Sequence, residues 1–347
     1  LTLGMPSTAA NQESADKETE ETDDSLPTGR VDSALPYTKR LPPTVEYDAD
    51  IHGLRCRRCD NRYDPSIDGL RRTIECCHSL EAVDRDDIPI CELNLKRTPE
   101  ERAISPWSDA QLRFLQAVYN AQQLRYDTLA YDLLTDSMIR LQEYVGIESE
   151  AVDELVEDGL LAHDTDHPHR LYTVTADGRS EIHVGHREGV AHGDGKGDLS
   201  ESSLHVAMVE LGRRYLEQAF LDDAASAVTE IVTYHEVGEY RLDAAGLDGD
   251  GEVVVTLEAE RVNHDINEAV PADYDKMAAR DPEAAIWITK GQVEGHEVLQ
   301  RLNDPADGEV RVEKTYSEST PPQQFRIDDP GCTDILPLRS VQNALTD

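Results

Sequence analysis

Five of the six cysteines lie between positions 56 and 91, and this clustering limits the local fold more than any other feature of the chain. Outside oxidising compartments, clustered cysteines favour a metal site over disulfides. Cys56 and Cys59 form a C-x₂-C pair, whose spacing lets a tight turn place two thiolates on one tetrahedral ion. The second half of the predicted site is the run Glu75-Cys76-Cys77-His78, which begins sixteen residues after Cys59.

This spacing resembles that of a zinc ribbon, although the second half of a ribbon is normally another C-x₂-C pair. The side chains of adjacent residues diverge, so we expect Cys76 and Cys77 not to bind the same ion. The fourth ligand is then Cys77 or His78, with Cys91 as an outside candidate. The alternative is a small core that buries free thiols. A segment of about 40 residues has too little core to fold alone, so a structural Zn²⁺ would supply its stability.

The chain carries 71 acidic residues against 33 basic ones, a formal net charge of −38. Acid is spread along the whole length and Arg outnumbers Lys by 26 to 7, which resembles the composition of haloarchaeal proteins. In molar salt the Debye length is about 3 Å, so self-repulsion costs little. The net charge therefore indicates a cytoplasm with molar salt, and it does not exclude binding to DNA.

Residues 51–75 depart from this acidic background, with six arginines against four acids. Arginine binds phosphate with a planar fork of donors, so this segment favours contact with nucleic acid. A protein partner is the alternative. The predicted nucleic-acid-binding residues are Arg55, Arg57, Arg58, Arg62, Arg71 and Arg72.

Residues 103–187 predict three helices followed by a β-hairpin. The first helix begins after Ser108, which is a good N-cap; the second covers 126–135; and the third is capped by Ser149 and ends at Gly159. The sequence LVEDGLL…RLYTVTADGR resembles that of the winged helix-turn-helix family. In that family the third helix would enter the major groove of DNA. That helix carries six acids here, so the alternative is a winged helix used for dimerisation or domain packing.

Residues 200–347 predict an αβββαβ order after a flexible linker at 188–199. The expected elements are a helix at 203–220, strands at 228–234, 240–247 and 252–262, a helix at 269–279 and a buried strand at 284–289. Alternation places Glu258 and Glu260 on one strand face. With a hairpin loop at 248–251, Asp243 pairs with Thr256 and lies diagonal to Glu258, at about 7–8 Å. Two such carboxylates can hold one Mg²⁺ or Mn²⁺ ion.

This pattern resembles the PD-(D/E)xK, or restriction-endonuclease-like, superfamily. The resemblance implies that Asp243 and Glu258 bind the metal and that Glu210 is the acid of the preceding helix. Glu260 stands where the family has its lysine, and Lys276 on the following helix is the candidate substitute. The alternative is a cross-strand ion pair between Arg241 and Glu258 on a solvated acidic face.

The expected fold class is thus an α+β multidomain chain. We expect a disordered acidic tail at 1–48, a zinc-ribbon-like module at 49–97, the winged helix, the linker and the nuclease-like domain with a C-terminal extension. The first residues do not resemble a signal peptide, which predicts a cytoplasmic protein, and no apolar run is long enough to span a membrane.

The domain combination resembles replication-relaxation and mobilisation accessory proteins of plasmids and integrative elements, with a partly degenerate nuclease-like domain. The resemblance implies a DNA-associated accessory or regulatory protein of a haloarchaeal mobile element, with a homodimer through the winged helix as a candidate assembly. Two alternatives are an active Mg²⁺- or Mn²⁺-dependent DNA endonuclease and a protein-interaction adaptor that does not touch DNA.

Overall fold

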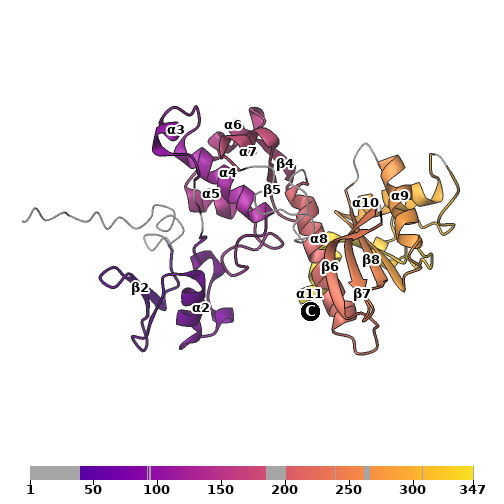
Figure 1. The fold of residues 1–347 in the computed structure, drawn as a ribbon, viewed down its shortest axis with the longest axis horizontal. Helices are drawn as coiled ribbons and strands as arrows, with labels where there is room; N and C mark the ends of the chain where they lie inside the picture. The colour runs from indigo at the N-terminus through magenta and orange to yellow at the C-terminus, as the bar shows by residue number, and fades with distance from the viewer. Residues whose placement is uncertain are drawn as a thin grey trace, which may run out of the picture.

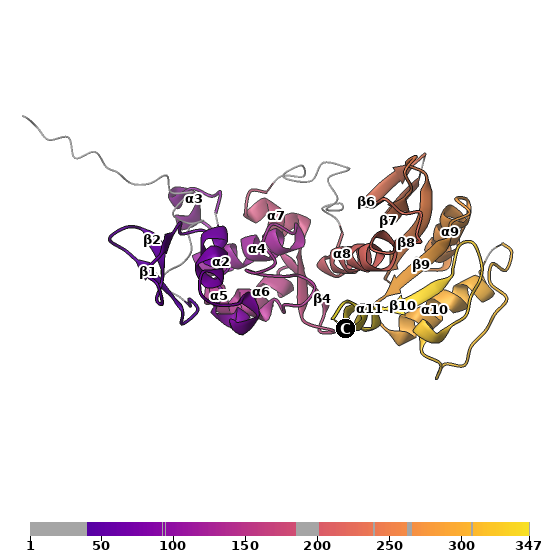
Figure 2. The same cartoon turned by 90° about the horizontal axis from the view of Figure 1, so that it is seen from below.

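The structure is a computed structural model that describes residues 40–346 except 92, 94, 185–200, 239, 262–265 and 307. Most of the tail expected at 1–48 and the whole linker expected at 188–199 therefore lie outside the described residues. Three bodies follow one another in chain order, from the indigo N-terminal body through the magenta middle body to the orange and yellow C-terminal body (Figures 1 and 2). None of the described helices is long and apolar enough to cross a membrane.

The N-terminal body is a small antiparallel sheet packed beside one helix. Its elements are β1 (Val45–Asp48), β2 (Gly53–Cys56), β3 (Arg62–Tyr63) and α2 (Ile67–Glu75), followed by 3₁₀ turns at Leu80–Ala82 and Arg85–Asp87. The Ser66 side chain accepts the backbone N–H of Gly69 and so begins α2. The buried core is formed by Val45, Leu54, Leu70, Ile74, Ile88 and Cys91. So small a core supplies little stability by itself.

The middle body contains helices and one β-hairpin. Its elements are α3 (Pro99–Ala103), α4 (Asp109–Gln122), α5 (Ile139–Val145), α6 (Ser149–Glu157), β4 (Leu161–Thr165), β5 (Leu171–Val174) and α7 (Ala176–Glu181). Helix α4 begins as expected at Ser108, which forms a reciprocal capping box with Gln111. Ser149 is the first residue of α6 rather than its cap, because Glu148 holds the N-cap position.

The second helix of this body does not lie at 126–135, so that prediction is wrong. This segment forms turns, and the helix that follows α4 is α5 at Ile139–Val145. The cause is local hydrogen bonding by aspartates: the Asp127 carboxylate accepts the N–H of Leu129, and the Asp132 carboxylate accepts the N–H of Leu134. Such side-chain bonds compete with helix formation.

The C-terminal body is a five-stranded mixed sheet between helices. Its elements are α8 (Ser203–Leu216), a π-helical turn (Glu217–Leu221), β6 (Glu230–Val237), β7 (Tyr240–Leu247), β8 (Val253–Glu260), α9 (Ile266–Ala278), β9 (Ala284–Thr289), α10 (Gln292–Asn303), a 3₁₀ turn (Pro322–Gln324), β10 (Asp334–Pro337) and α11 (Leu338–Thr346). The strand order is β10-β9-β8-β7-β6, antiparallel from β6 to β8 and parallel from β8 to β10. The expected αβββαβ order is therefore present.

The register of the central hairpin differs from the expected one by two residues. Ala245, not Asp243, pairs with Thr256, and a bulge lies at Gly246 and Leu247. Continuing this register past the Ala244–Leu257 pair sets Asp243 directly opposite Glu258 rather than diagonal to it. The hairpin loop already sets Leu247 opposite Val253 rather than Glu252, and the bulge adds the second residue of the shift.

Helix α8 joins the middle and C-terminal bodies. It packs on β6, β7 and β8 of the sheet and also contacts β4 and β5 of the hairpin (Figure 2). One continuous hydrophobic cluster includes Phe114 and Tyr172 of the middle body together with Met208 of α8 and Leu257 of β8. Two bodies that share one core cannot move freely against each other.

Candidate metal centre and acidic pocket

Four cysteines of the N-terminal body converge at one point. The Sγ atoms of Cys56, Cys59, Cys76 and Cys77 all lie within 4.8 Å of one another. Those of Cys59 and Cys76 are 3.2 Å apart, and those of Cys76 and Cys77 are 3.9 Å apart. Four thiolates arranged tetrahedrally around Zn²⁺, with Zn–S bonds of about 2.3 Å, would lie about 3.8 Å from one another. The four cysteines could therefore hold a metal ion such as zinc.

The first two cysteines are placed by a tight turn after β2. The Asp60 N–H donates to the Cys56 carbonyl (2.9 Å), and the Cys56 N–H donates to the Asn61 carbonyl (2.9 Å). Asp60 adopts a left-handed backbone conformation with φ of 58°, which turns the chain back on itself. This conformation suits aspartate better than most residues. The turn directs the thiols of the C-x₂-C pair to the same side.

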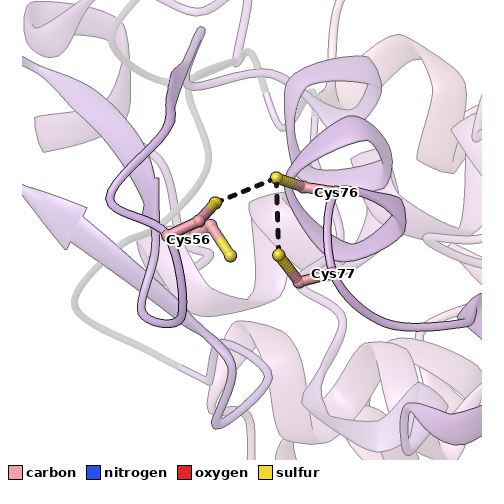
Figure 3. Close-up of side chains that lie close together, drawn as sticks. Cys56, Cys76 and Cys77 are labelled. Atoms are coloured by element: carbon pink, nitrogen blue, oxygen red, sulfur yellow. Dashed lines mark hydrogen bonds between the residues drawn. The ribbon is translucent and has the colours of Figure 1, made fainter.

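The other two cysteines come from the end of α2. Figure 3 shows the thiols of Cys76 and Cys77 projecting toward the loop that carries Cys56. Cys76 continues the helical conformation, and the N–H groups of Cys77 and His78 both donate to the Ile74 carbonyl, at 3.3 and 2.9 Å. This tightened last turn brings two adjacent side chains to one side.

The expectation that the adjacent cysteines diverge is therefore not met, since both thiols belong to the cluster. His78, named in the sequence as an alternative fourth ligand, is not part of this group, and neither is Cys91. Cys91 is buried in the apolar core of the same body, with its thiol 3.8 Å from the Pro89 carbonyl.

Hydrogen bonds within the cluster divide the thiols into unlike groups. Bonds from the side chains of Tyr63 and Cys59 lower the pKa of Cys76 to about 6. Interaction with Cys59 and burial raise the pKa of Cys77 to about 12. The low pKa of Cys76 thus arises from O–H and S–H donors directed at its sulfur. A bound cation would replace these protons with its own charge.

The six arginines singled out in the sequence have different surroundings. Arg55 pairs with Glu46 (3.2 Å), and Arg71 reaches Asp127 of the middle body (2.6 Å). Arg58 donates to the Cys77 carbonyl (3.3 Å) and so ties the two halves of the cysteine cluster together.

Three of these arginines remain available to a ligand. Arg57 and Arg72 have 59% exposed side chains and only long contacts with acids, at 3.9 and 3.8 Å. Arg62 is exposed, and its side chain makes no hydrogen bond or ion pair with the described part of the chain. Arg57, Arg62 and Arg72 are therefore the exposed arginines of the six that lack a short hydrogen bond or ion pair, and Arg72 lies over the Tyr63 ring, 5.7 Å from its centroid.

The middle body presents a different surface. The acids of α6 and its flanks are all exposed: Glu148, Glu150, Asp153, Glu154, Glu157 and Asp158. The hairpin β4–β5 packs against α8, because Thr173 and Asp164 accept the N–H groups of Ser203 and Leu204, at 2.6 and 3.1 Å. This arrangement favours domain packing over DNA reading for the helix-and-hairpin unit.

Three of the four acids predicted in the C-terminal body line a pocket of about 350 Å³ beside β7 and β8. Its lining includes Asp243, Glu258 and Glu260. Asp243 holds the strand ends together: its carboxylate accepts the Ala259 N–H (2.9 Å), and its own N–H lies 3.4 Å from Glu258 Oε1.

Each of the two predicted metal-binding acids already has a cationic neighbour. Lys276 Nζ on α9 lies 2.9 Å from Glu258 and 2.7 Å from Asp273. Although burial lowers its pKa, these carboxylates raise the pKa of Lys276 above its ordinary value. His205 Nε2 on α8 lies 3.2 Å from Asp243 Oδ2. Arg241 pairs with Glu201 (2.9 Å), not with Glu258 as in the cross-strand alternative.

The structure places Glu210 away from this pocket, where it pairs with Arg213 (2.7 Å) and Arg214 (3.2 Å). The α8 side of the pocket is formed instead by His205 and by Glu201, just before the helix. Sequence reasoning missed both residues. His205 lies in the first turn of the expected helix, but Glu201 precedes the N-cap Ser202, so no helical spacing rule links the two.

Charges inside the pocket act on one another. Burial lowers the pKa of His205, but the carboxylates of Asp243 and Glu201 outweigh this and raise it to about 10. Burial opposes ionisation of Asp243, yet the charge of His205 lowers the pKa of this acid. Burial, together with the carboxylates of Asp273 and Asp243, raises the pKa of Glu260 to about 8.

Comparisons of the chain with protein-family models, curated proteins and solved structures found no match.

Proposed function

We propose that the chain is a zinc-binding, DNA-associated protein whose N-terminal body contacts the phosphate backbone. The observation that carries this proposal is the four-cysteine cluster, which joins β2 and α2 next to exposed arginines. A structural Zn²⁺ there would hold Arg57, Arg62 and Arg72 on a rigid support, and arginine forks suit phosphate oxygens.

Two features of the other bodies support this assignment. Six exposed acids on and beside α6 would repel phosphates, so this helix is a poor DNA reader. The hairpin that could have contacted DNA is occupied by α8. The arginine face of the N-terminal body is then the surface best suited to DNA. Its setting, as inferred from the sequence, is an accessory role on a haloarchaeal plasmid or integrative element.

A charge-matched comparison tests DNA binding. Zinc-loaded protein is titrated onto fluorescent duplex DNA over a KCl series, alongside a triple variant with Arg57, Arg62 and Arg72 replaced by glutamine. We expect weaker binding, with the slope of log affinity against log salt reduced by about 0.9 for each arginine that contacts a phosphate. The control replaces three exposed arginines elsewhere, Arg113, Arg280 and Arg339, and should keep the parent slope.

Equal behaviour of the two triple variants would contradict the proposed surface. If the parent itself does not bind DNA at any salt, the adaptor alternative takes its place. Zinc content is measured separately, so loss of DNA binding through loss of metal is recognised.

A second candidate function is a metal-dependent DNA endonuclease. The observation that favours it is that Asp243 and Glu258 lie across neighbouring strand ends and line one pocket. With Mn²⁺ in molar KCl, the protein should then nick plasmid DNA, and Asp243→Asn should abolish nicking. Asp250→Asn, an exposed change on the adjacent hairpin loop, should not. Failure to nick with Mg²⁺, Mn²⁺ or Co²⁺ would remove this candidate.

A further inference from the structure

We propose that the acidic pocket binds one divalent transition-metal ion through Nε2 of His205 and the carboxylates of Asp243 and Glu260. This site differs from the pair suggested by the sequence resemblance, because a histidine enters it and Glu258 does not. The inference concerns metal binding alone and requires neither DNA binding nor nuclease activity.

The orientation of His205 is the first observation. Its Nδ1 lies 3.2 Å from the carboxylate of Glu201, while its Nε2 points to Asp243. Histidines that bind metals typically donate the other ring N–H to a carboxylate, which fixes the tautomer and the ring plane. Glu201 would serve as this orienting carboxylate, leaving Nε2 free to exchange its proton for a metal ion.

The second observation is an acid without a partner. Glu260 is only 7% exposed and lines the pocket, and its carboxylate makes no hydrogen bond or ion pair with another described side chain. A buried carboxylate in this situation is costly unless a proton or a cation joins it. The positive charge of a metal ion in the pocket would compensate the negative charges of Glu260 and Asp243 together.

The third observation removes Glu258 from the ligand set. Its carboxylate is 6% exposed and lies 2.9 Å from the ammonium group of Lys276. Binding a metal would require breaking this buried pair, whereas Glu260 has no such bond to lose. Lys276 therefore makes Glu258 a supporting residue of the pocket wall rather than a ligand.

The pocket is not assembled in advance. Among the described residues, only the four cysteines bring three or more ligand atoms within 4.8 Å of one another. Loading thus requires side-chain rotation in the pocket. The donor set of one imidazole and two carboxylates suits Mn²⁺ or Fe²⁺ better than Mg²⁺, which prefers oxygen ligands and keeps its waters. Three protein ligands would leave coordination positions open to water or an anion.

Mn²⁺ is the probe that tests this site. The 347-residue chain is loaded with one Zn²⁺ per molecule, which the four thiolates take up in preference to the pocket, and excess zinc is removed. It is then titrated with Mn²⁺ and followed by electron paramagnetic resonance. We expect one Mn²⁺ per chain, bound more tightly than Mg²⁺ in competition, with a ¹⁴N coupling from the imidazole in the spin-echo spectrum. His205→Gln should remove the ¹⁴N coupling, and Asp243→Asn and Glu260→Gln should each weaken binding at least about tenfold.

Glu252→Gln is the matched control, since this exposed acid lies on the loop before the same strand. It should bind Mn²⁺ like the parent. The spectrum of the unaltered protein decides the question even if a variant fails to fold. Absence of bound Mn²⁺, absence of ¹⁴N coupling, or equal weakening by Glu252→Gln would each overturn the proposal. Mn²⁺ binding without DNA nicking would support the site while removing the nuclease candidate.

Discussion

The Asp164 carboxylate on β4 accepts the backbone N–H of Leu204 in the first turn of α8, at 3.1 Å. The same oxygen accepts the hydroxyl of Thr173 (2.7 Å), whose oxygen in turn accepts the Ser203 N–H (2.6 Å). Ser202 caps the helix by accepting the His205 N–H. The hairpin of the middle body therefore satisfies N–H groups that a helix end leaves without partners. It joins the two bodies through hydrogen bonds as well as through their shared core.

Removing this carboxylate should destabilise the junction. We expect Asp164→Ala to lower the free energy of unfolding by about 1–3 kcal/mol, because the Leu204 N–H and the Thr173 hydroxyl lose a buried acceptor. Urea unfolding checks this value. Asp166→Ala is the control: Asp166 is exposed and bonds Arg170 at the surface, so it should cost no more than about 1 kcal/mol. Similar costs for the two variants would show that the junction does not depend on Asp164.

Metal loss should unfold the N-terminal body, because its apolar core is small. We expect Cys76→Ser and Cys77→Ser each to reduce zinc content and to make residues 40–91 sensitive to limited proteolysis, with α8 and the sheet protected. Two controls lie close by: Cys91→Ser and His78→Ala should both retain zinc. Full zinc retention by Cys77→Ser, combined with loss in His78→Ala, would restore the histidine as the fourth ligand.

Parts of this architecture follow from the sequence alone. The bounds expected for 240–247 and 284–289 coincide with β7 and β9. Residues 284–289 are an apolar run, whereas in 240–247 the polar Arg241 and Asp243 alternate with apolar residues before a Gly-rich turn. Helix α4 was located by its cap. The helix expected at 126–135 is absent because the side chains of Asp127 and Asp132 bond nearby N–H groups and form turns there.

The sequence indicates which residue types form the candidate sites, but it does not indicate how their side chains are arranged. The cysteines could be named from spacing, yet the tight last turn that aligns Cys76 and Cys77 is a conformational detail. Glu210 and His205 are five residues apart, which separates them by about 140° around a helix. Only the packing of α8 on the sheet decides which of them faces the pocket. The bulge has one sequence signal, the isolated Gly246 within the strand, but a glycine alone does not fix the resulting register.

Lys276 should be important for stability. Its side chain is 10% exposed and pairs with both Glu258 and Asp273, so Lys276→Met leaves the buried Glu258 and the half-buried Asp273 without this cation. We expect a loss of about 3–5 kcal/mol in the free energy of unfolding, the range seen when one partner of a buried pair is removed. Combining Lys276→Met with Glu258→Gln should recover part of this lost stability. Lys290→Met, which removes a partly exposed lysine without an ion pair in the described structure, should change stability by less than about 0.5 kcal/mol.

His169 should make the middle body sensitive to mild acid. Its ring lies 2.9 Å from the Leu133 carbonyl, and burial lowers its pKa below the ordinary value of 6.5, although that hydrogen bond opposes the shift. As the pH falls below 6.5, the unfolded chain takes up a proton before the folded one, so the free energy of unfolding decreases. The contribution is complete above the unfolded pKa and is lost as the pH falls through the folded pKa.

Urea unfolding between about pH 7.5 and pH 5.5 measures this slope. We expect His169→Gln to reduce it, because the variant has no group to protonate at that position. His167→Gln, a change at an exposed histidine of the same turn, should leave the slope unaltered. If His169→Gln keeps the slope of the parent, other groups cause the acid sensitivity. The buried acids of the C-terminal pocket would then be substituted next.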